Sequence, residues 1–149
     1  MYRVDLTDYV NADTANNGDI REWAVCRYFG VERVKHDNSR YDMASDCEIG
    51  ELKISIKANR FSLMSGSLCK GCDTFDDIWN RYNENVHSNT WAYVTKDWQC
   101  YIMDKEEFSK FIHSFARLDR ESSKRGGGKK IKGKEESKAM LNWLEGGCA

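Results

Sequence analysis

The sequence predicts an α/β protein of the α+β kind, in which a central mixed β-sheet is flanked by helices, and three observations lead to this prediction. Residues 45–57 alternate between polar and apolar side chains on both sides of a Gly50-Glu51 turn, which is typical of a β-hairpin. Residues 74–85 and 104–118 instead place apolar side chains at helical spacing. Strands and helices are interleaved along the chain, and this order favours a mixed sheet covered by helices.

Composition limits the class of protein. A chain of 149 residues fits one domain spanning 1–149, and 40% hydrophobic residues is ordinary for a globular protein. The charge is unevenly distributed: the segment from Arg117 to Lys138 holds nine Lys and Arg residues against four Asp and Glu residues. The formal net charge of −1 therefore hides an acidic body with a basic C-terminal segment.

The cysteines and the first residues indicate a compartment. Six cysteines are present, but the N-terminal MYRVDLTDYV lacks the apolar run of a signal peptide, so we expect reduced thiols and a cytoplasmic protein. No uninterrupted apolar run approaches the roughly 18 residues of a membrane span. The sequence therefore predicts a soluble protein with no membrane partner.

The first half of the chain predicts a helix followed by three strands. Residues 1–17 end in the polar run NADTANN, which predicts a loop or loose arm. A helix is expected from about Asp19, a plausible N-cap, to Gly30. Residues 31–35 alternate as a short strand, HDNSR predicts a turn, and the hairpin completes the set.

The hairpin is expected to have one charged face and one apolar face. Asp46 and Glu48 share a face on its first strand, while Lys53, Ser55 and Lys57 share a face on its second strand. Apolar or weakly polar side chains form the opposite face: Cys47, Ile49, Leu52, Ile54 and Ile56. Two carboxylates near an ammonium are what phosphodiester hydrolysis with a divalent metal requires.

The second half predicts a loop at 61–72, a helix at 74–85 behind an Asp73/Thr74 cap, and a second hairpin formed by 90–95 and 98–103. Asp104 is expected to cap a helix that runs to about Leu118. Residues 119–134 contain SSKRGGGKKIKGK, which predicts a basic flexible loop, and a short C-terminal helix is expected at 135–145.

This order of elements over residues 18–118 resembles the PD-(D/E)xK nuclease superfamily, which includes many restriction endonucleases and Holliday junction resolvases. The resemblance implies a restriction endonuclease-like αβββαβ core. Members carry an acid on the second strand, an acid-x-Lys triplet on the third, and often a glutamate on the first helix. On this chain the second-strand acid corresponds to Asp46 or Asp42, the triplet to Ser55-Ile56-Lys57, and the helical acid to Glu22.

The triplet departs from the family pattern, because Ser55 stands where an acid is expected and cannot supply negative charge to a magnesium ion. We prefer the interpretation in which Glu48, on the same face as Asp46, provides the second carboxylate. In the alternative, the triplet is Glu51-Leu52-Lys53, which would place Glu51 in the hairpin turn.

The resemblance implies a metal-dependent endonuclease acting on DNA. Asp46 and Glu48 would bind Mg²⁺ or Mn²⁺, Lys57 would orient the attacking water or neutralise developing charge, and Glu22 and Ser55 would complete the catalytic site. Family context suggests a phage, mobile-element or defence role. Nucleases of this fold often pair to cut two strands, which leaves the oligomeric state open between monomer and homodimer.

Two other functions stay open. One is a catalytically impaired nuclease fold that binds nucleic acid or a protein partner, for example as an inhibitor of a nucleic-acid-processing complex. The other is an interaction protein of unrelated α+β fold, in which the hairpin charges are simply the solvated face of an edge hairpin.

Further residues are candidates for phosphate contact. Ser65 and Ser67 lie in the loop just beyond Lys57, where hydroxyl groups could contact phosphate, although an ordinary polar loop is the slightly preferred interpretation. The basic tract, with Arg125, Lys129, Lys130 and Lys132, suits non-specific contact with phosphates, and a solvated flexible tail is its rival interpretation. Cys69 and Cys72 form a lone CxxC, which is more simply two loop cysteines than a zinc site.

Overall fold

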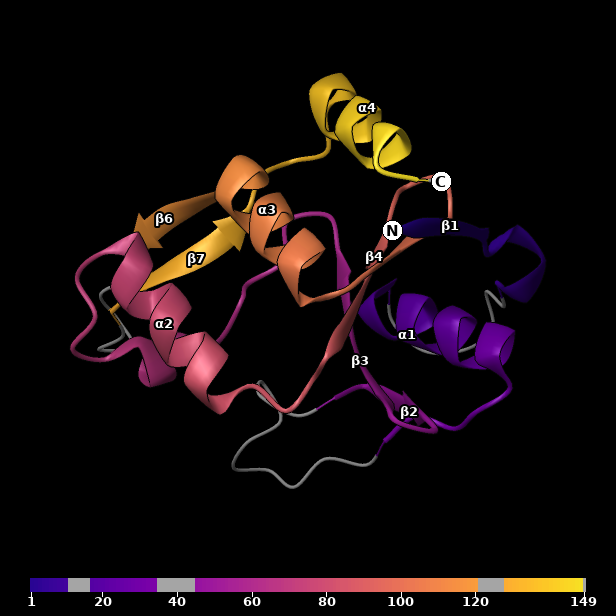
Figure 1. The fold of residues 1–149 in the computed structure, drawn as a ribbon, viewed down its shortest axis with the longest axis horizontal. Helices are drawn as coiled ribbons and strands as arrows, with labels where there is room; N and C mark the ends of the chain where they lie inside the picture. The colour runs from indigo at the N-terminus through magenta and orange to yellow at the C-terminus, as the bar shows by residue number, and fades with distance from the viewer. Residues whose placement is uncertain (11–16, 35–44, 121–127, 149) are drawn as a thin grey trace.

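The computed structural model describes residues 1–10, 17–34, 45–120 and 128–148, and a five-stranded sheet lies at its centre (Figure 1). The strand order is β1-β5-β4-β3-β2; β3 and β4 run parallel and every other neighbouring pair is antiparallel. The mixed sheet predicted from the sequence is therefore confirmed. Its strands are β1 (Tyr2–Asp5), β2 (Cys47–Ile49), β3 (Leu52–Ala58), β4 (Thr90–Val94) and β5 (Gln99–Met103).

Helices cover both faces of this sheet. Helix α1 (Asn17–Phe29) packs on one face, where Val25 lies in a buried cluster with Ile54 and Ala92 of the strands. On the other face Trp91 and Tyr101 lie in a second cluster with side chains of α2 (Phe75–Asn85), α3 (Lys105–Phe115) and α4 (Lys138–Gly146). Two cores separated by one sheet result, which is the layered arrangement that the interleaved sequence predicted.

Local sequence signals explain where several elements begin and end. Thr74 accepts a hydrogen bond from the backbone N–H of Asp77 while the Asp77 carboxylate accepts from the backbone of Thr74, so the predicted cap of α2 is a reciprocal capping box. Asp104 caps α3 in the same way. Gly50, at φ +56°, forms the β2–β3 turn in the left-handed region that glycine adopts without strain.

Strand β1 corrects the prediction of a loop or loose arm over residues 1–17. It pairs antiparallel with β5, with Val4 opposite Cys100. Only Val4 of its four residues is buried, so the strand lies at the sheet edge with most side chains outward. A single inward apolar residue is a weak sequence signal, which explains why the strand was missed.

The strand predicted at 31–35 is wrong for residues 31–34, which form neither helix nor strand. The backbone N–H of Val31 donates to the carbonyl of Cys26 at 3.0 Å, and that of Val34 donates to the carbonyl of Asp46 at 2.9 Å. The backbone N–H groups of Val31 and Val34 are thus satisfied by the end of the helix and by the entry to the hairpin, and do not need a neighbouring strand. Residue 35 and the turn expected after it lie outside the described residues, so two of the three strands expected between α1 and α2 are described.

A two-stranded ribbon replaces part of the expected basic loop at 119–134. Helix α3 ends at Phe115 rather than near Leu118, and β6 (Ala116–Arg120) pairs antiparallel with β7 (Lys129–Gly133). Ile131 of β7 is fully buried, and a Cβ at Gly133 would lie 2.6 Å from the ring of Phe61. Packing of these two residues holds β7 against the body, so a flexible loop is wrong for the described part of this segment.

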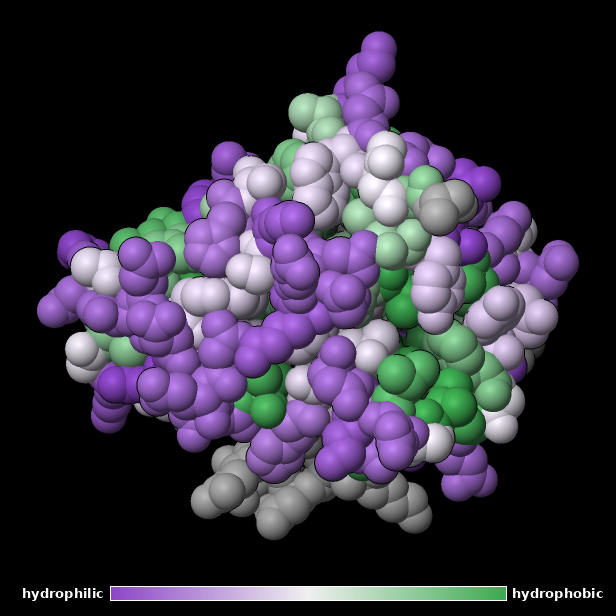
Figure 2. Space-filling view, in the orientation of Figure 1, coloured by the Kyte–Doolittle hydropathy of each residue, from purple (hydrophilic) through white to green (hydrophobic). Residues whose placement is uncertain are grey.

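The expected C-terminal helix at 135–145 is α4, which begins at Lys138 behind a Ser137 cap. All six cysteines lie in the described part of the chain, and none forms a disulfide. Within the described ranges, no helix is both long and apolar enough to cross a membrane. Figure 2 shows that the face in view is mostly hydrophilic, with apolar atoms in separate areas.

Candidate functional site

The register of the β2–β3 hairpin places Asp46 beside the centre of β3. Cys47 pairs with Ile54 and Glu48 with Lys53, and Asp46 directly precedes this pairing at the entry to β2. The backbone N–H of Asp46 donates to the carbonyl of Ile54 at 2.7 Å. In return, the backbone N–H of Ile56 donates to Asp46 Oδ2 at 2.6 Å. The carboxylate is therefore fixed against the strand that carries Lys57.

A cavity of about 270 Å³ opens between α1 and the end of β3. Glu22 of α1 and Lys57 of β3 both line it, and so does Ile56, whose N–H binds Asp46. Glu22 and Lys57 thus share one cavity, and Asp46 is joined to its wall through the backbone N–H of Ile56. The lining residues are Arg21, Glu22, Ile56, Lys57, Ala58, Phe61 and Ser62.

An ion pair holds the Glu22 carboxylate. Arg33 Nη2 lies 2.6 Å from Glu22 Oε2, and both side chains are about three-quarters buried. The Arg33 guanidinium also lies over the ring of Trp23, 5.6 Å from its centroid, and Arg27 lies 5.8 Å from the same centroid. Partial burial strengthens the attraction between the two charges, so Glu22 is oriented at the cavity wall before any ligand binds.

Glu48 occupies a different part of the hairpin. It is exposed, stands opposite Lys53 next to the turn, and accepts a hydrogen bond from Ser45 Oγ at 3.0 Å. Lys53 and Lys57 are four residues apart on β3, which corresponds to about 13 Å along a strand. Of the two candidate acids, Glu22 is the one that shares a cavity with Lys57.

Ser55, at the first position of the variant triplet, is only 5% exposed. It is paired with Trp91 of β4 and directly precedes Ile56, whose N–H binds Asp46. Glu51, from the alternative triplet, lies in the β2–β3 turn as expected, and its carbonyl accepts from Asn89 Nδ2 at 2.8 Å. That turn is at the opposite end of β3 from Lys57.

The donor chemistry at the cavity fits a magnesium ion. Among the described residues, no cluster of three or more His, Cys, Asp or Glu side chains is arranged to hold a metal. Mg²⁺, however, commonly binds one or two carboxylates and keeps several waters, with substrate phosphate as a further ligand. Asp46 and Glu22 are carboxylates of the right type, although at Glu22 a metal has to compete with Arg33.

The residues predicted to contact phosphates fall in two places. Ser65 and Ser67 lie at a short 3₁₀ helix, η2 (Gly66–Cys69), with their hydroxyl oxygens 3.1 Å apart. Lys129, Lys130 and Lys132 lie on β7, so the basic tract is partly a strand. Arg125 and the alternative acid Asp42 lie outside the described residues.

Arg21 and Arg33 are residues of the site that sequence reasoning missed. Arg21 lines the cavity and lies over the ring of Trp98, 5.7 Å from its centroid. Arg33 was missed because residues 31–35 were interpreted as a short strand from their alternation, and no site role was considered for the charged residues of that segment. The sequence held no distinct signal for Arg21, because neighbouring residues on a helix do not face each other and its place at the cavity depends on how α1 packs.

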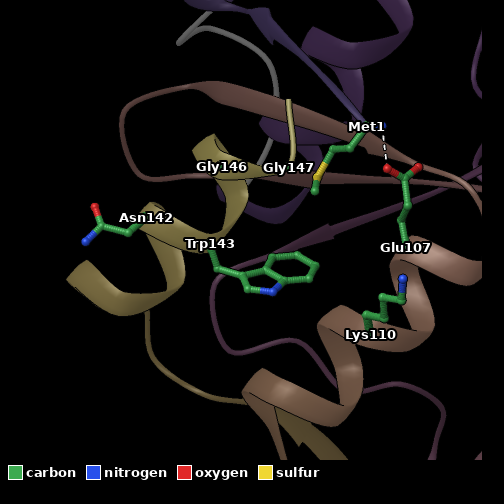
Figure 3. A pocket seen from close by; sticks show the side chains of 7 residues that line it. All are labelled: Met1, Glu107, Lys110, Asn142, Trp143, Gly146 and Gly147. Carbon is green, nitrogen blue, oxygen red and sulfur yellow. Dashed lines mark ion pairs between the residues drawn. The ribbon is translucent and has the colours of Figure 1, made fainter. Parts of the chain in front are cut away.

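A second cavity, of about 400 Å³, lies between α3 and α4 (Figure 3). The amino group of Met1 forms an ion pair with Glu107 at its wall. Trp143 presents its ring to the cavity from α4. None of the predicted site residues in the described ranges lines this cavity, so it is separate from the Glu22 and Lys57 site.

Comparison of the chain with known protein families, curated proteins and solved structures finds no match. The resemblance to the PD-(D/E)xK superfamily therefore stays a prediction from element order and the residues around Ile56.

Proposed function

We propose that the protein is a metal-dependent endonuclease that hydrolyses phosphodiester bonds of DNA. The observation that carries this proposal is that Glu22 and Lys57 line one cavity, while the Asp46 carboxylate is held by the backbone N–H of Ile56 in the wall of that cavity. Two carboxylates can hold a divalent cation, and an ammonium beside them can stabilise the charge that develops on a phosphate under attack.

Each residue has a distinct task. Asp46 and Glu22 are the side chains that would hold Mg²⁺ or Mn²⁺; when bound, the ion supplies a water of lowered pKa and polarises the scissile phosphate. Lys57 neutralises charge on the phosphate oxygens or orients the attacking water. The hydrogen bond from Ile56 keeps the Asp46 carboxylate in one orientation.

A catalytically impaired nuclease fold is the second candidate, and Ser55 favours it. This residue is buried on β3 at the position where the triplet acid is expected, and its hydroxyl carries no charge. Such a protein would bind nucleic acid or a protein partner without cutting.

Plasmid cleavage in Mg²⁺ or Mn²⁺ separates the two candidates. We expect Asp46→Asn and Lys57→Met to slow cleavage by about 100-fold or more, because each removes a charge that acts in the transition state. Lys53→Met is the matched control, since Lys53 is on the same face of the same strand but near the turn. DNA binding without cleavage in either metal would overturn the endonuclease proposal and favour the second candidate.

A further inference from the structure

The β6–β7 ribbon places like charges opposite one another. Arg117 pairs with Lys132, and Arg120 pairs with Lys129. Like charges directly opposite on antiparallel strands destabilise a ribbon. The acid on the described part of the ribbon is Asp119, whose carboxylate lies 3.3 Å from Lys132 Nζ. The ribbon therefore keeps an excess of positive charge that a polyanion would neutralise.

The two faces of the ribbon differ. Leu118 and Ile131 are opposite each other on one face, and Ile131 is buried in the core. By alternation, Arg117, Asp119, Lys130 and Lys132 are on the other face, which is the basic face. Arg120 and Lys129 share the face of Leu118 and Ile131 at the end of the described ribbon, which we call its rim. Arg117 is exposed, so the basic face is directed away from the core. Figure 1 shows that β6 and β7 lie outside the central sheet, next to α2 and α3.

The ribbon is joined directly to the wall of the candidate active site. Ser62 forms a β-bridge with Lys132, and the backbone N–H of Gly133 donates to the carbonyl of Phe61 at 2.8 Å. Phe61 and Ser62 also line the cavity that holds Glu22 and Lys57. A nucleic acid bound along the ribbon therefore lies next to that cavity.

We propose that the basic face and rim of the β6–β7 ribbon bind the backbone of double-stranded DNA and hold it at the cavity between α1 and β3. This assignment of a duplex substrate rests on the proposed endonuclease function. A two-stranded β-ribbon is narrow enough to enter the major groove, which is about 12 Å wide. The two rows of phosphates that border the groove match the basic side chains on the two strands of the ribbon. Those side chains are Arg117, Lys130 and Lys132 on the basic face, and Arg120 and Lys129 at the rim.

The test measures binding of a fluorescent duplex in EDTA over a range of salt concentrations, so that no cleavage occurs. Arg117→Gln and Arg120→Gln are the variants, because both side chains are exposed; Lys129 is avoided, since its Nζ donates to the carbonyl of Asp73. Lys105→Gln is the matched control, an exposed basic residue at the start of α3, about 16 Å along that helix from β6.

We expect each ribbon variant to bind the duplex several-fold more weakly and to reduce the salt slope by about 0.9 for each phosphate that the variant no longer neutralises. The melting temperature of the free protein should stay the same or rise, because one member of a like-charge pair has been removed. The control should change neither affinity nor slope.

Three results would overturn the inference: unchanged affinity and salt slope in both ribbon variants, an equal loss of affinity in Lys105→Gln, or single-stranded DNA bound as tightly as the duplex. The assay also separates the two proposals. If the ribbon variants weaken duplex binding but the protein cuts no DNA, only the endonuclease function is overturned. If the protein cuts DNA but the ribbon variants bind it as the wild type does, only the DNA-binding role of the ribbon is overturned.

Discussion

At the scale of single residues, the hydrogen bond between Ile56 and Asp46 links stability to the site. Asp46→Ala removes the acceptor of a backbone N–H, which we expect to lower the free energy of unfolding by about 1.5–3 kcal/mol, because the acceptor is charged. Asp46→Asn keeps a carbonyl oxygen that can accept from the Ile56 N–H, so its free energy of unfolding should fall clearly less. Urea unfolding of both variants checks this, and equal stability of the two would contradict the bond's structural role.

Ser55 allows a direct test of the missing carboxylate. Ser55→Asp places a second acid next to Ile56, whose N–H binds the Asp46 carboxylate, at a position that is nearly inaccessible to solvent. We expect a lower melting temperature in EDTA, because two carboxylates repel each other at close range, and recovery on adding Mg²⁺ or Mn²⁺. Ser55→Ala serves as the control that adds no charge. If the melting temperature of Ser55→Asp does not change when Mg²⁺ or Mn²⁺ is added, there is no cation site beside Asp46.

Alternation, a local property, placed Asp46 and Lys57 on the charged face of the hairpin, whereas Glu22 became a candidate through the resemblance to the nuclease superfamily. Sequence reasoning could not choose between Glu22 and Glu48, since that choice depends on how α1 packs against the end of β3. The ion pair between Arg33 and Glu22 could not be predicted for the same reason. The turn that ends α1 brings Arg33 back to Glu22, and the sequence does not specify the path of that turn.

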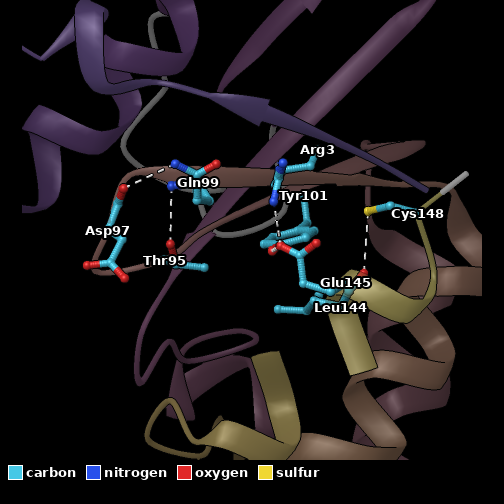
Figure 4. Close-up of polar contacts among 8 residues, drawn as sticks. All are labelled: Arg3, Thr95, Asp97, Gln99, Tyr101, Leu144, Glu145 and Cys148. Atoms are coloured by element: carbon cyan, nitrogen blue, oxygen red, sulfur yellow. Dashed lines mark hydrogen bonds and ion pairs between the residues drawn. The ribbon is translucent and has the colours of Figure 1, made fainter. Parts of the chain in front are cut away.

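At the scale of elements, Glu145 fastens α4 to the sheet (Figure 4). Its carboxylate accepts from the hydroxyl of Tyr101 on β5 and forms an ion pair with Arg3 of β1 at 2.7 Å. These two contacts, the Tyr101 hydrogen bond first, hold the pKa of Glu145 below its usual value. A carboxyl with a lowered pKa in the folded state stabilises that state above its unfolded pKa, and the contribution is lost as pH falls through the folded pKa.

We therefore expect Glu145→Gln to unfold at a lower urea concentration than the wild type at pH 7. Because the wild-type carboxylate becomes protonated in acid, the two midpoints should converge well below the ordinary Glu pKa of about 4.3. Urea titrations across this pH range measure the difference. Glu106→Gln, on the exposed surface of α3, is the control and should track the wild type at every pH. A gap between Glu145→Gln and wild type that persists in acid would contradict the ionic origin of the contact.

Elements were predictable where their own residues specify them. The capping boxes of α2 and α3 and the turn at Gly50 are encoded within a few positions, and those elements are confirmed. The ribbon was missed because lysines and glycines dominate it, and its stability depends on Ile131 and Gly133 packing against residues some seventy positions earlier. For residues 31–34 the sequence signal was present but the strand is absent. Their side chains alternate, yet within the described ranges no strand pairs with them.

At the scale of the whole molecule, one sheet carries both cores. Trp91 stacks on Phe108 with ring centroids 4.7 Å apart and donates to Tyr82 Oη at 2.9 Å, while Ile54 lies in the core on the α1 face. Because β4 and β5 contribute side chains to both clusters, the two faces should unfold together.

Truncation on either face tests this. We expect Phe111→Ala to lower the free energy of unfolding by about 3–5 kcal/mol and Ile54→Ala by about 2–5 kcal/mol, because both side chains are fully buried. Tryptophan fluorescence and far-UV circular dichroism should give one coincident urea transition in each variant. Two separate transitions would show that the faces are independent.

The central claim is that Glu22, rather than Glu48, joins Asp46 and Lys57 in a cation-dependent nuclease site. The most direct measurement compares single-turnover cleavage of duplex DNA by wild type, Glu22→Gln and Glu48→Gln in Mg²⁺. We expect Glu22→Gln to lose about 100-fold or more and Glu48→Gln to stay within about threefold of wild type. Full activity in Glu22→Gln, with loss in Glu48→Gln, would contradict the site around Ile56.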